Sequence, residues 1–219
     1  MKETLDYLPN TNINLYQRSD MFKINTDTGL LGSFIKVNSN DSVLDIGTNN
    51  GALLLYASLY TSNLLVGVDI IEEACVLASK NLDLNGISNY KIINSDINNL
   101  VIDKFDVIVS NPPYFKNNNL LMTNENKFKC YARHEIYLTL ESLVSFISNH
   151  LNSNGHCFIV HRADRISDIV TLFNDYGLRV KTLQFVYDVN KDNAISVLVE
   201  GILGSSTNCD VLAPIIIKR

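Results

Sequence analysis

A series of short apolar runs that alternate with helical patterns constrains the fold of this chain more than any other feature. The runs have the length of β-strands and cover residues 42–46, 65–69, 90–94 and 106–110. Helical patterns over 51–60 and 72–85 separate the first three runs. Strands that alternate with helices form βαβ crossovers, which predict a parallel sheet covered by helices on both faces.

The second half of the chain is expected to complete this sheet. The pattern predicts a helix over 135–151 that is stopped by Asn-Ser-Asn-Gly155, then a strand over 157–161 and a helix over 163–176. Strands over 180–187 and 194–201 are joined by a segment too short for a crossover helix, which predicts an antiparallel hairpin at the sheet edge. The expected fold is therefore α/β, with a mostly parallel seven-stranded sheet and a C-terminal antiparallel hairpin.

Length and composition predict one cytoplasmic domain. The 219 residues can bury one full core, so we expect a single domain over 1–219. Within it, 1–41 are expected to form an N-terminal segment that covers a ligand site, and 42–219 the catalytic core. No apolar run approaches the roughly 20 residues that span a bilayer, and the charged N-terminal residues do not resemble a secretion signal. The four cysteines are scattered, which predicts reduced thiols and no metal site.

The net charge of −5 does not by itself favour binding to nucleic acid. Of the 18 Lys and Arg residues, however, 12 lie after residue 103. Such clustering favours a local positive rim, although scattered basic residues are also typical of a solvated face. The basic residues of this predicted rim are Lys116, Lys127, Lys129, Arg133, Arg162 and Arg165.

The turn after the first apolar run is typical of a nucleoside-cofactor site. It contains Asp45, Gly47, Asn49 and Gly51, and small or left-handed-tolerant residues let backbone N–H groups approach a ligand. Asp69, followed by Ile70, lies 69 − 47 = 22 residues beyond Gly47. That is close to the ~20-residue offset at which an acidic residue binds ribose hydroxyls. These positions together predict a site for S-adenosylmethionine.

Two of the acidic positions have alternative interpretations. Asp69 and Glu72 also fit a capping box at the start of a helix, and one Asp can serve in both roles. Asp96, followed by Ile97, ends the third run and is expected to meet the edge of adenine. A loop Asp or a helix N-cap explains Asp96 equally well.

The Asn-Pro-Pro-Tyr sequence after the fourth run predicts the reacting centre. Consecutive prolines fix φ and remove backbone donors, so that carbonyl oxygens of Asn111 and Pro112 can face a ligand. The Asn111 side chain and the Pro112 carbonyl can accept the two hydrogens of an exocyclic amine and stabilise the charge that develops there. Beyond Pro113, Tyr114, with Phe115, is expected to stack a base. The alternative interpretation is a Pro-rich turn that caps a strand.

These motifs resemble the class I S-adenosylmethionine-dependent methyltransferases that act on amino nitrogens, and the resemblance covers nearly the whole chain. The finer resemblance is to bacterial tRNA(Val) adenine methyltransferases. Thr26-Asp-Thr-Gly-Leu-Leu-Gly32 is similar to a segment of that family, which implies that Thr26 and Asp27 border the methionine end of the cofactor. Ala132-Arg-His-Glu135 and Val160-His-Arg162 also resemble family segments. Asn49 departs from the family pattern, because many class I enzymes have Gly there.

The resemblance implies a Rossmann-like fold and methylation of the 6-amino group of an adenine in tRNA, with the anticodon-loop adenine of tRNA(Val) as the expected target. We expect residues 116–134 to form a substrate loop whose basic groups contact phosphate. His134 either contacts RNA or fixes this loop, and Arg133 either does the same or forms a surface salt bridge.

Other substrates and a non-enzymatic role remain alternatives. Asn-Pro-Pro-Tyr is also typical of enzymes that methylate adenine in ribosomal RNA or DNA, or glutamine in release factors. Only about 40 residues precede the first predicted strand, whereas release-factor enzymes carry a helical domain there and DNA enzymes usually add a recognition domain. A second alternative is an inactive methyltransferase fold that binds RNA. We expect a monomer or weak homodimer without membrane contact.

Overall fold

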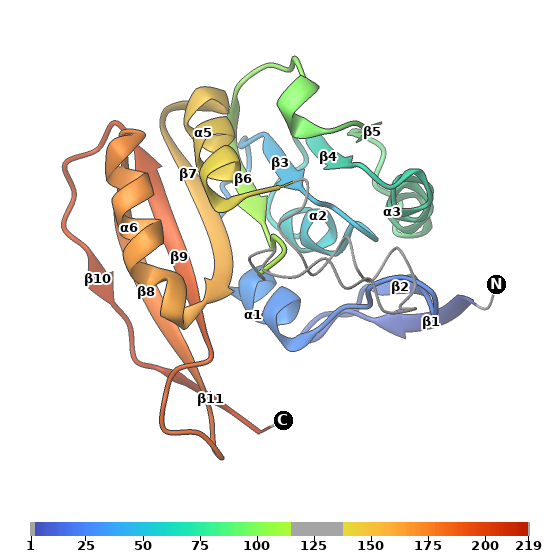
Figure 1. Ribbon diagram of the computed structural model, residues 1–219. Helices are drawn as coiled ribbons and strands as arrows, with labels where there is room; N and C mark the ends of the chain where they lie inside the picture. Colours follow the sequence, from blue (N-terminus) through green and yellow to red (C-terminus); the bar gives the residue numbers. More distant parts are fainter. Residues whose placement is uncertain (1–2, 115–137, 219) are drawn as a thin grey trace, which may run out of the picture.

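The computed structural model describes residues 3–114 and 138–218 (Figure 1). Its central sheet begins with β3 (Val43–Ile46), β4 (Leu65–Asp69), β5 (Tyr90–Asn94) and β6 (Phe105–Ser110). All neighbours among these four strands are parallel, in the order β5-β4-β3-β6. The four strands that the apolar runs predict are thereby confirmed, two of them with the predicted bounds.

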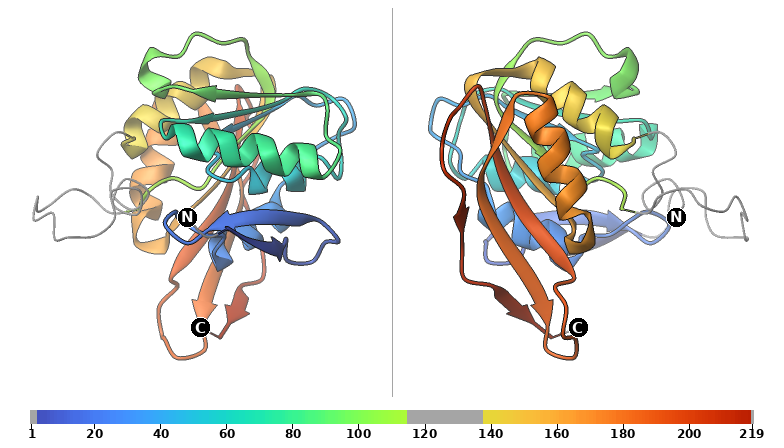
Figure 2. Two further views of the ribbon diagram at one scale, coloured as in Figure 1. Left: turned by 90° about the vertical axis from the view of Figure 1, so that its right-hand side faces the viewer. Right: turned by 60° about the vertical axis from the view of Figure 1, so that its left-hand side comes forward.

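The other half of the sheet contains β7 (Leu151–Arg162), β8 (Leu178–Asp188) and β9 (Ser196–Leu203). The order continues β6-β7-β9-β8, with β7 parallel to β6 and β9 antiparallel to both of its neighbours. The predicted hairpin is therefore confirmed. Its turn extends beyond the rest of the sheet (Figures 1 and 2).

The predicted number of seven strands is too low by two. Two short strands, β10 (Asp210–Val211) and β11 (Ile215–Ile217), pair in parallel with β8, so that β8 is not an edge strand. Both β10 residues are exposed. β10 is held by backbone pairing with β8, so no buried apolar run marks it in the sequence.

Helices cover both faces of the sheet, as expected (Figure 2). One face packs against α1 (Thr26–Phe34), α2 (Ala52–Ala57) and Leu82 of α3 (Glu72–Leu84). The other packs against η1 (Ile97–Asn99), α5 (Leu140–His150) and α6 (Ile166–Asp175), the last of which follows the short helix η2 (Ala163–Arg165). Successive side chains of a strand point to opposite faces of the sheet. Because helices cover both faces at β3 and β6, both sides of these strands are buried, which explains their continuous apolar runs.

The boundary predicted between α5 and the next strand is wrong. Thr139 caps α5 by accepting from the Ser142 N–H at 3.1 Å, and β7 begins at Leu151 directly after the helix. The pairing then shifts from Leu151 opposite Phe105 to His156 opposite Val107. Asn154 lies in this irregularity with φ 61°. The Asn-Ser-Asn-Gly sequence thus forms a bulge inside a strand. Asn and Gly are common in bulges as well as in loops.

An N-terminal hairpin that the apolar pattern did not predict comprises β1 (Glu3–Tyr7) and β2 (Asn14–Arg18). The side chain of Asn81 on α3 accepts from the Tyr16 N–H at 2.6 Å and donates to the Tyr16 carbonyl at 3.0 Å. These bonds fix β2 beside α3 (Figure 1). The segment after β2 then leads to the start of α1.

Across residues 3–114 and 138–218, none of the helices has both the length and the apolarity that crossing a membrane requires. Within the same ranges no group of three or more His, Cys, Asp or Glu side chains is placed to hold a metal ion.

Candidate active site

The predicted site lies where the strand order of the sheet reverses. In the order β5-β4-β3-β6-β7, the chain runs outward in both directions from β3 and β6, and in open parallel sheets ligands bind at the carboxyl ends of strands beside such a switch point. Ile46 and Ser110 are partners in the register, and the Ser110 hydroxyl donates to the Ile46 carbonyl at 2.8 Å. The turn after β3 and the Asn-Pro-Pro-Tyr loop after β6 are therefore neighbours.

The turn after β3 has the left-handed geometry that its residues predict. Gly47, Asn49 and Gly51 have φ angles of 74°, 48° and 79°. Asn tolerates this region better than most residues with a side chain, which explains how it replaces the usual middle Gly. Its amide donates to the Phe22 carbonyl at 2.7 Å. Asn49 thus ties the turn to the N-terminal segment, a bond that Gly cannot form.

Asp45 brings a carboxyl group into the core beneath this turn. Its exposed fraction is 1%, and the Thr48 hydroxyl donates to Oδ2 at 2.8 Å. Oδ1 is buried and has no hydrogen-bond partner among the described residues. Burial, with a smaller contribution from the nearby Asp69 charge, raises the pKa of Asp45 to about 7.

Asp69 connects the turn to the start of α3. Its carboxylate accepts from the Asn49 N–H at 2.9 Å and from the Ile71 N–H at 3.0 Å. The N-cap position of α3 is Ile71, so the capping box suggested for Asp69 and Glu72 does not form. Burial raises the pKa of Asp69. Ile70, beside it, has an exposed side chain.

Asp96 follows β5 on the same edge and has the N-cap geometry that was its alternative interpretation. Its Oδ1 accepts from the backbone N–H of Asn98 at 2.9 Å and from the side-chain amide of Asn98 at 2.8 Å, at the start of η1. Ile97 is buried. The capping role is therefore formed, and the adenine contact stays a prediction.

The Asn-Pro-Pro-Tyr loop is held from two sides. The Asn111 amide nitrogen donates to the Thr28 hydroxyl at 3.0 Å, and the Tyr114 hydroxyl donates to Asn111 Oδ1. Pro112 is buried and Pro113 is half-buried. The Tyr114 ring lies 5.2 Å from the His161 ring, centroid to centroid. The loop is thus linked to both α1 and the end of β7.

His161, Thr28 and Asn25 contribute to this site but were not predicted. His161 is buried at the end of β7 and its Nδ1 accepts from the Arg162 N–H at 2.9 Å. Burial, followed by the Arg165 charge, lowers the pKa of His161 to about 4. Asn25 caps α1 by accepting from the Thr28 N–H at 2.8 Å. The Asn-x-x-Thr spacing indicates such a cap, but no local signal links it to Asn111.

Thr26 and Asp27 lie at the start of α1 and line a hollow of about 660 Å³. None of the predicted strand-end residues lines this hollow. Asp27 is buried and accepts from the Ser196 hydroxyl of β9 at 3.0 Å, so it also fixes α1 to the sheet.

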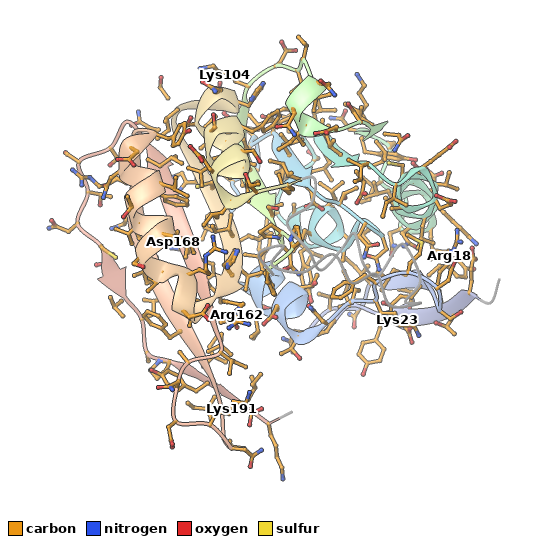
Figure 3. All side chains as sticks on the ribbon, viewed as in Figure 1. Arg18, Lys23, Lys104, Arg162, Asp168 and Lys191 are labelled. Carbon is orange, nitrogen blue, oxygen red and sulfur yellow. The ribbon has the colours of Figure 1, made fainter. Side chains whose placement is uncertain are left out.

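Of the predicted substrate contacts, Tyr114 and Arg162 belong to the described part of the chain. The expected substrate loop over 116–134 lies outside the described residues, and so do the predicted contacts Phe115, Lys127, Lys129, Arg133 and His134. Arg162 lies at the carboxyl end of β7, and Lys23 lies between β2 and α1 (Figure 3). The Arg162 guanidinium pairs with the Asp164 carboxylate. A phosphate contact from Arg162 would therefore compete with this ion pair.

Comparison with known proteins agrees with this geometry. The methyltransferase domain family matches residues 37–198. A methyltransferase from Pyrococcus furiosus has a TM-score of 0.66 at 18% identity, covering 90% of this chain and 92% of that chain. The tRNA m1G37 methyltransferase of M. jannaschii has a TM-score of 0.70 at 15% identity, covering 93% and 57%. The fold and its switch-point site therefore define a methyltransferase of the Rossmann-like class.

Sequence relatives narrow this class. A tRNA1(Val) (adenine(37)-N6)-methyltransferase of Pedobacter heparinus is 32% identical over 77% of this chain and 73% of its own length. The release factor glutamine methyltransferase of Lactococcus lactis is 31% identical but covers 59% of this chain and 51% of its own length. The chain belongs to the family of tRNA1(Val) (adenine(37)-N6)-methyltransferases.

Proposed function

We propose that this chain transfers a methyl group from S-adenosylmethionine to the 6-amino group of an adenine in tRNA, and that the anticodon-loop adenine of tRNA(Val) is its target. The observation that carries the proposal is the placement of Asn111 beside the turn after β3, with its amide nitrogen bonded to Thr28 and its oxygen facing Tyr114. The names of the sequence relatives support the choice of substrate.

The residues of the turn fit the cofactor that this reaction needs. The buried Oδ1 of Asp45 has no partner among the described residues and suits a donor such as an ammonium group. Gly47 is exposed in left-handed geometry, and nothing lies within 4 Å of the place where a Cβ would be, which leaves room for a ligand. When bound, S-adenosylmethionine supplies an electrophilic methyl group. Asp69, at the end of the next strand, is the residue proposed for the ribose hydroxyls.

The residues of the loop would then act on the amine. Asn111 Oδ1 and the Pro112 carbonyl accept its two hydrogens, which draws electron density onto nitrogen and stabilises the positive charge that develops during attack. The donor would leave as S-adenosylhomocysteine, and the cationic methylated amine would then lose one proton to water, so no strong base is required. The Tyr114 ring stacks the extruded base, which holds the amine in line for transfer.

Tyr114 already contacts the acceptor that this arrangement uses. Its hydroxyl donates to Asn111 Oδ1, the same acceptor that the amine requires. An amide oxygen has two lone pairs, so the arriving amine would compete with the tyrosine for this acceptor or share it. The Asn111 amide keeps its other bond, to Thr28, throughout.

The direct test is transfer of a labelled methyl group to unmodified tRNA(Val), beside ribosomal RNA, duplex DNA and a release factor, with nucleoside analysis of the product. We expect label on the 6-amino group of the anticodon-loop adenine. Asn111→Ala should bind S-adenosylmethionine normally and lose at least about 100-fold in turnover. Label confined to another acceptor would refute the tRNA assignment, and unchanged turnover in Asn111→Ala would refute the mechanism.

A further inference from the structure

The side-chain amide of Asn111 must be oriented for the proposed reaction, because its oxygen can accept from the amine and its nitrogen cannot. The two ends of a primary amide are nearly equal in size, so sterics alone do not distinguish the two orientations. A hydrogen-bond partner with a fixed polarity can do so. The partner in this structure is the Thr28 hydroxyl, 83 residues away in the sequence.

The polarity of Thr28 is set by a backbone group. The Thr28 N–H, which can only donate, lies 2.8 Å from the Asn25 side chain, so the Asn25 atom there must be Oδ1. The Thr28 hydroxyl lies 3.0 Å from the same Oδ1. A hydroxyl can donate only one hydrogen bond, and the Thr28 hydroxyl donates it to Asn25 Oδ1. Thr28 Oγ1 is left with lone pairs only.

This constraint passes on to Asn111. Because the Thr28 hydroxyl already donates its one hydrogen to Asn25, its oxygen can only accept a hydrogen bond from Asn111. The Asn111 atom 3.0 Å from Thr28 Oγ1 must therefore be the amide nitrogen. Oδ1 then faces the opposite side, where the Tyr114 hydroxyl donates to it. The orientation is thus determined by three bonds that start from the N-cap of α1.

We propose that Thr28, aligned by Asn25, is the positioning residue that holds the Asn111 amide with its oxygen toward the substrate amine. The inference rests on the proposed function of Asn111. It gives the N-terminal segment a role in turnover that differs from covering the cofactor. Asn25 and Thr28 are buried or half-buried beneath the loop, and neither has to touch the substrate for this role.

The test compares Thr28→Val, which keeps the shape but removes the hydroxyl, with Thr28→Ser, which keeps it. We expect Thr28→Val to lower kcat for tRNA(Val) about 10- to 100-fold, with KM for S-adenosylmethionine changed less than threefold. Thr28→Ser should restore kcat to within about threefold of the wild-type value. Ser33→Ala is the matched control. Among the described residues the Ser33 hydroxyl bonds only to the Gly29 carbonyl within α1, so its loss should leave kcat unchanged.

Each result has a defined meaning. Wild-type kcat in a folded Thr28→Val protein would overturn the inference and leave the proposed function intact. Absence of transfer by the wild-type chain to every acceptor would refute the proposed function, and the inference with it. If thermal unfolding shows that Thr28→Val is not folded, Asn25→Ala replaces it, because without that acceptor the Thr28 proton is free to turn toward Asn111. An unchanged kcat there would overturn the inference as well.

Discussion

At the scale of single residues, Asp45 carries an ionisable group into the core at the base of the predicted cofactor turn. One oxygen is satisfied by Thr48 and the other has no partner among the described residues. Buried carboxyl groups remain protonated to higher pH than exposed ones, because burial disfavours the charged form. This accounts for the raised pKa of Asp45, about 7.

The pKa of Asp45 predicts how stability changes with pH. Because the folded pKa lies above the value near 4 of an unfolded Asp, the favourable contribution is fully present below pH 4 and is lost as the pH rises to about 7. The loss amounts to at most about 4 kcal/mol. Asp45→Asn should remove this dependence, so its free energy of unfolding relative to the wild type should rise between pH 4 and pH 7. Denaturant titrations at several pH values would measure it, and parallel curves would contradict the assignment.

At the scale of elements, the packing of α1 on α2 depends on one glycine. A Cβ added at Gly32 would lie 2.1 Å from Cδ2 of Tyr56, which is buried and donates to the Pro9 carbonyl at 2.9 Å. The contact explains the Gly that ends the Thr-Asp-Thr-Gly-Leu-Leu-Gly segment. Because α1 carries Thr28, this packing also sets the distance between that helix and Asn111.

We therefore expect Gly32→Ala to destabilise the protein by about 2–4 kcal/mol, since Tyr56 must move or α1 must shift. Gly29→Ala is the matched control in the same helix. The nearest atom to its added Cβ is 3.5 Å away, which is an ordinary contact, and Ala favours helix. Its midpoint of thermal unfolding should match or exceed that of the wild type. Equal losses in the two variants would show that close packing on Tyr56 is not the cause.

The elements differ in how far the sequence determined them. The apolar runs of β4 and β5 end at polar residues on both strands, so their bounds were predictable. β10 is exposed and is held by backbone pairing with a distant strand, β11 has only three residues, and α5 passes into β7 without a loop. None of these features was therefore predictable. In the site, the turn and Asn111 were found from local motifs. Thr28 and His161 were not, because their relation to the loop exists only in three dimensions.

At the scale of the whole molecule, Glu200 joins segments that are far apart in the chain. From its position on β9 it accepts from Lys36 at 3.0 Å, pairs with His156 of β7 at 2.9 Å and accepts from Thr182 of β8. Its exposed fraction is 2%. Burial opposes ionisation of this carboxylate, but the three partners outweigh burial and lower its pKa to about 2.

This network predicts a loss of stability in acid. Because the folded pKa lies below the unfolded value of about 4.5, the contribution is present above pH 4.5 and is lost as the pH falls toward 2. It amounts to at most about 3 kcal/mol. Glu200→Gln keeps the shape and lacks the charge, so its unfolding free energy should be lower than that of the wild type at pH 6 and nearly equal at pH 2. A constant difference across this range would exclude Glu200 as the source.

The hydrogen bond from Tyr114 to Asn111 has a consequence for selectivity under the proposed mechanism. In the absence of a base, the acceptor that activates the amine is already engaged by the chain itself. A small amine gains too little from a single hydrogen bond to displace the tyrosine, whereas an adenine also gains the stacking energy of its ring, about 1–3 kcal/mol. The tyrosine would thereby protect the bound methyl donor from unproductive transfer to the free amines that surround the enzyme.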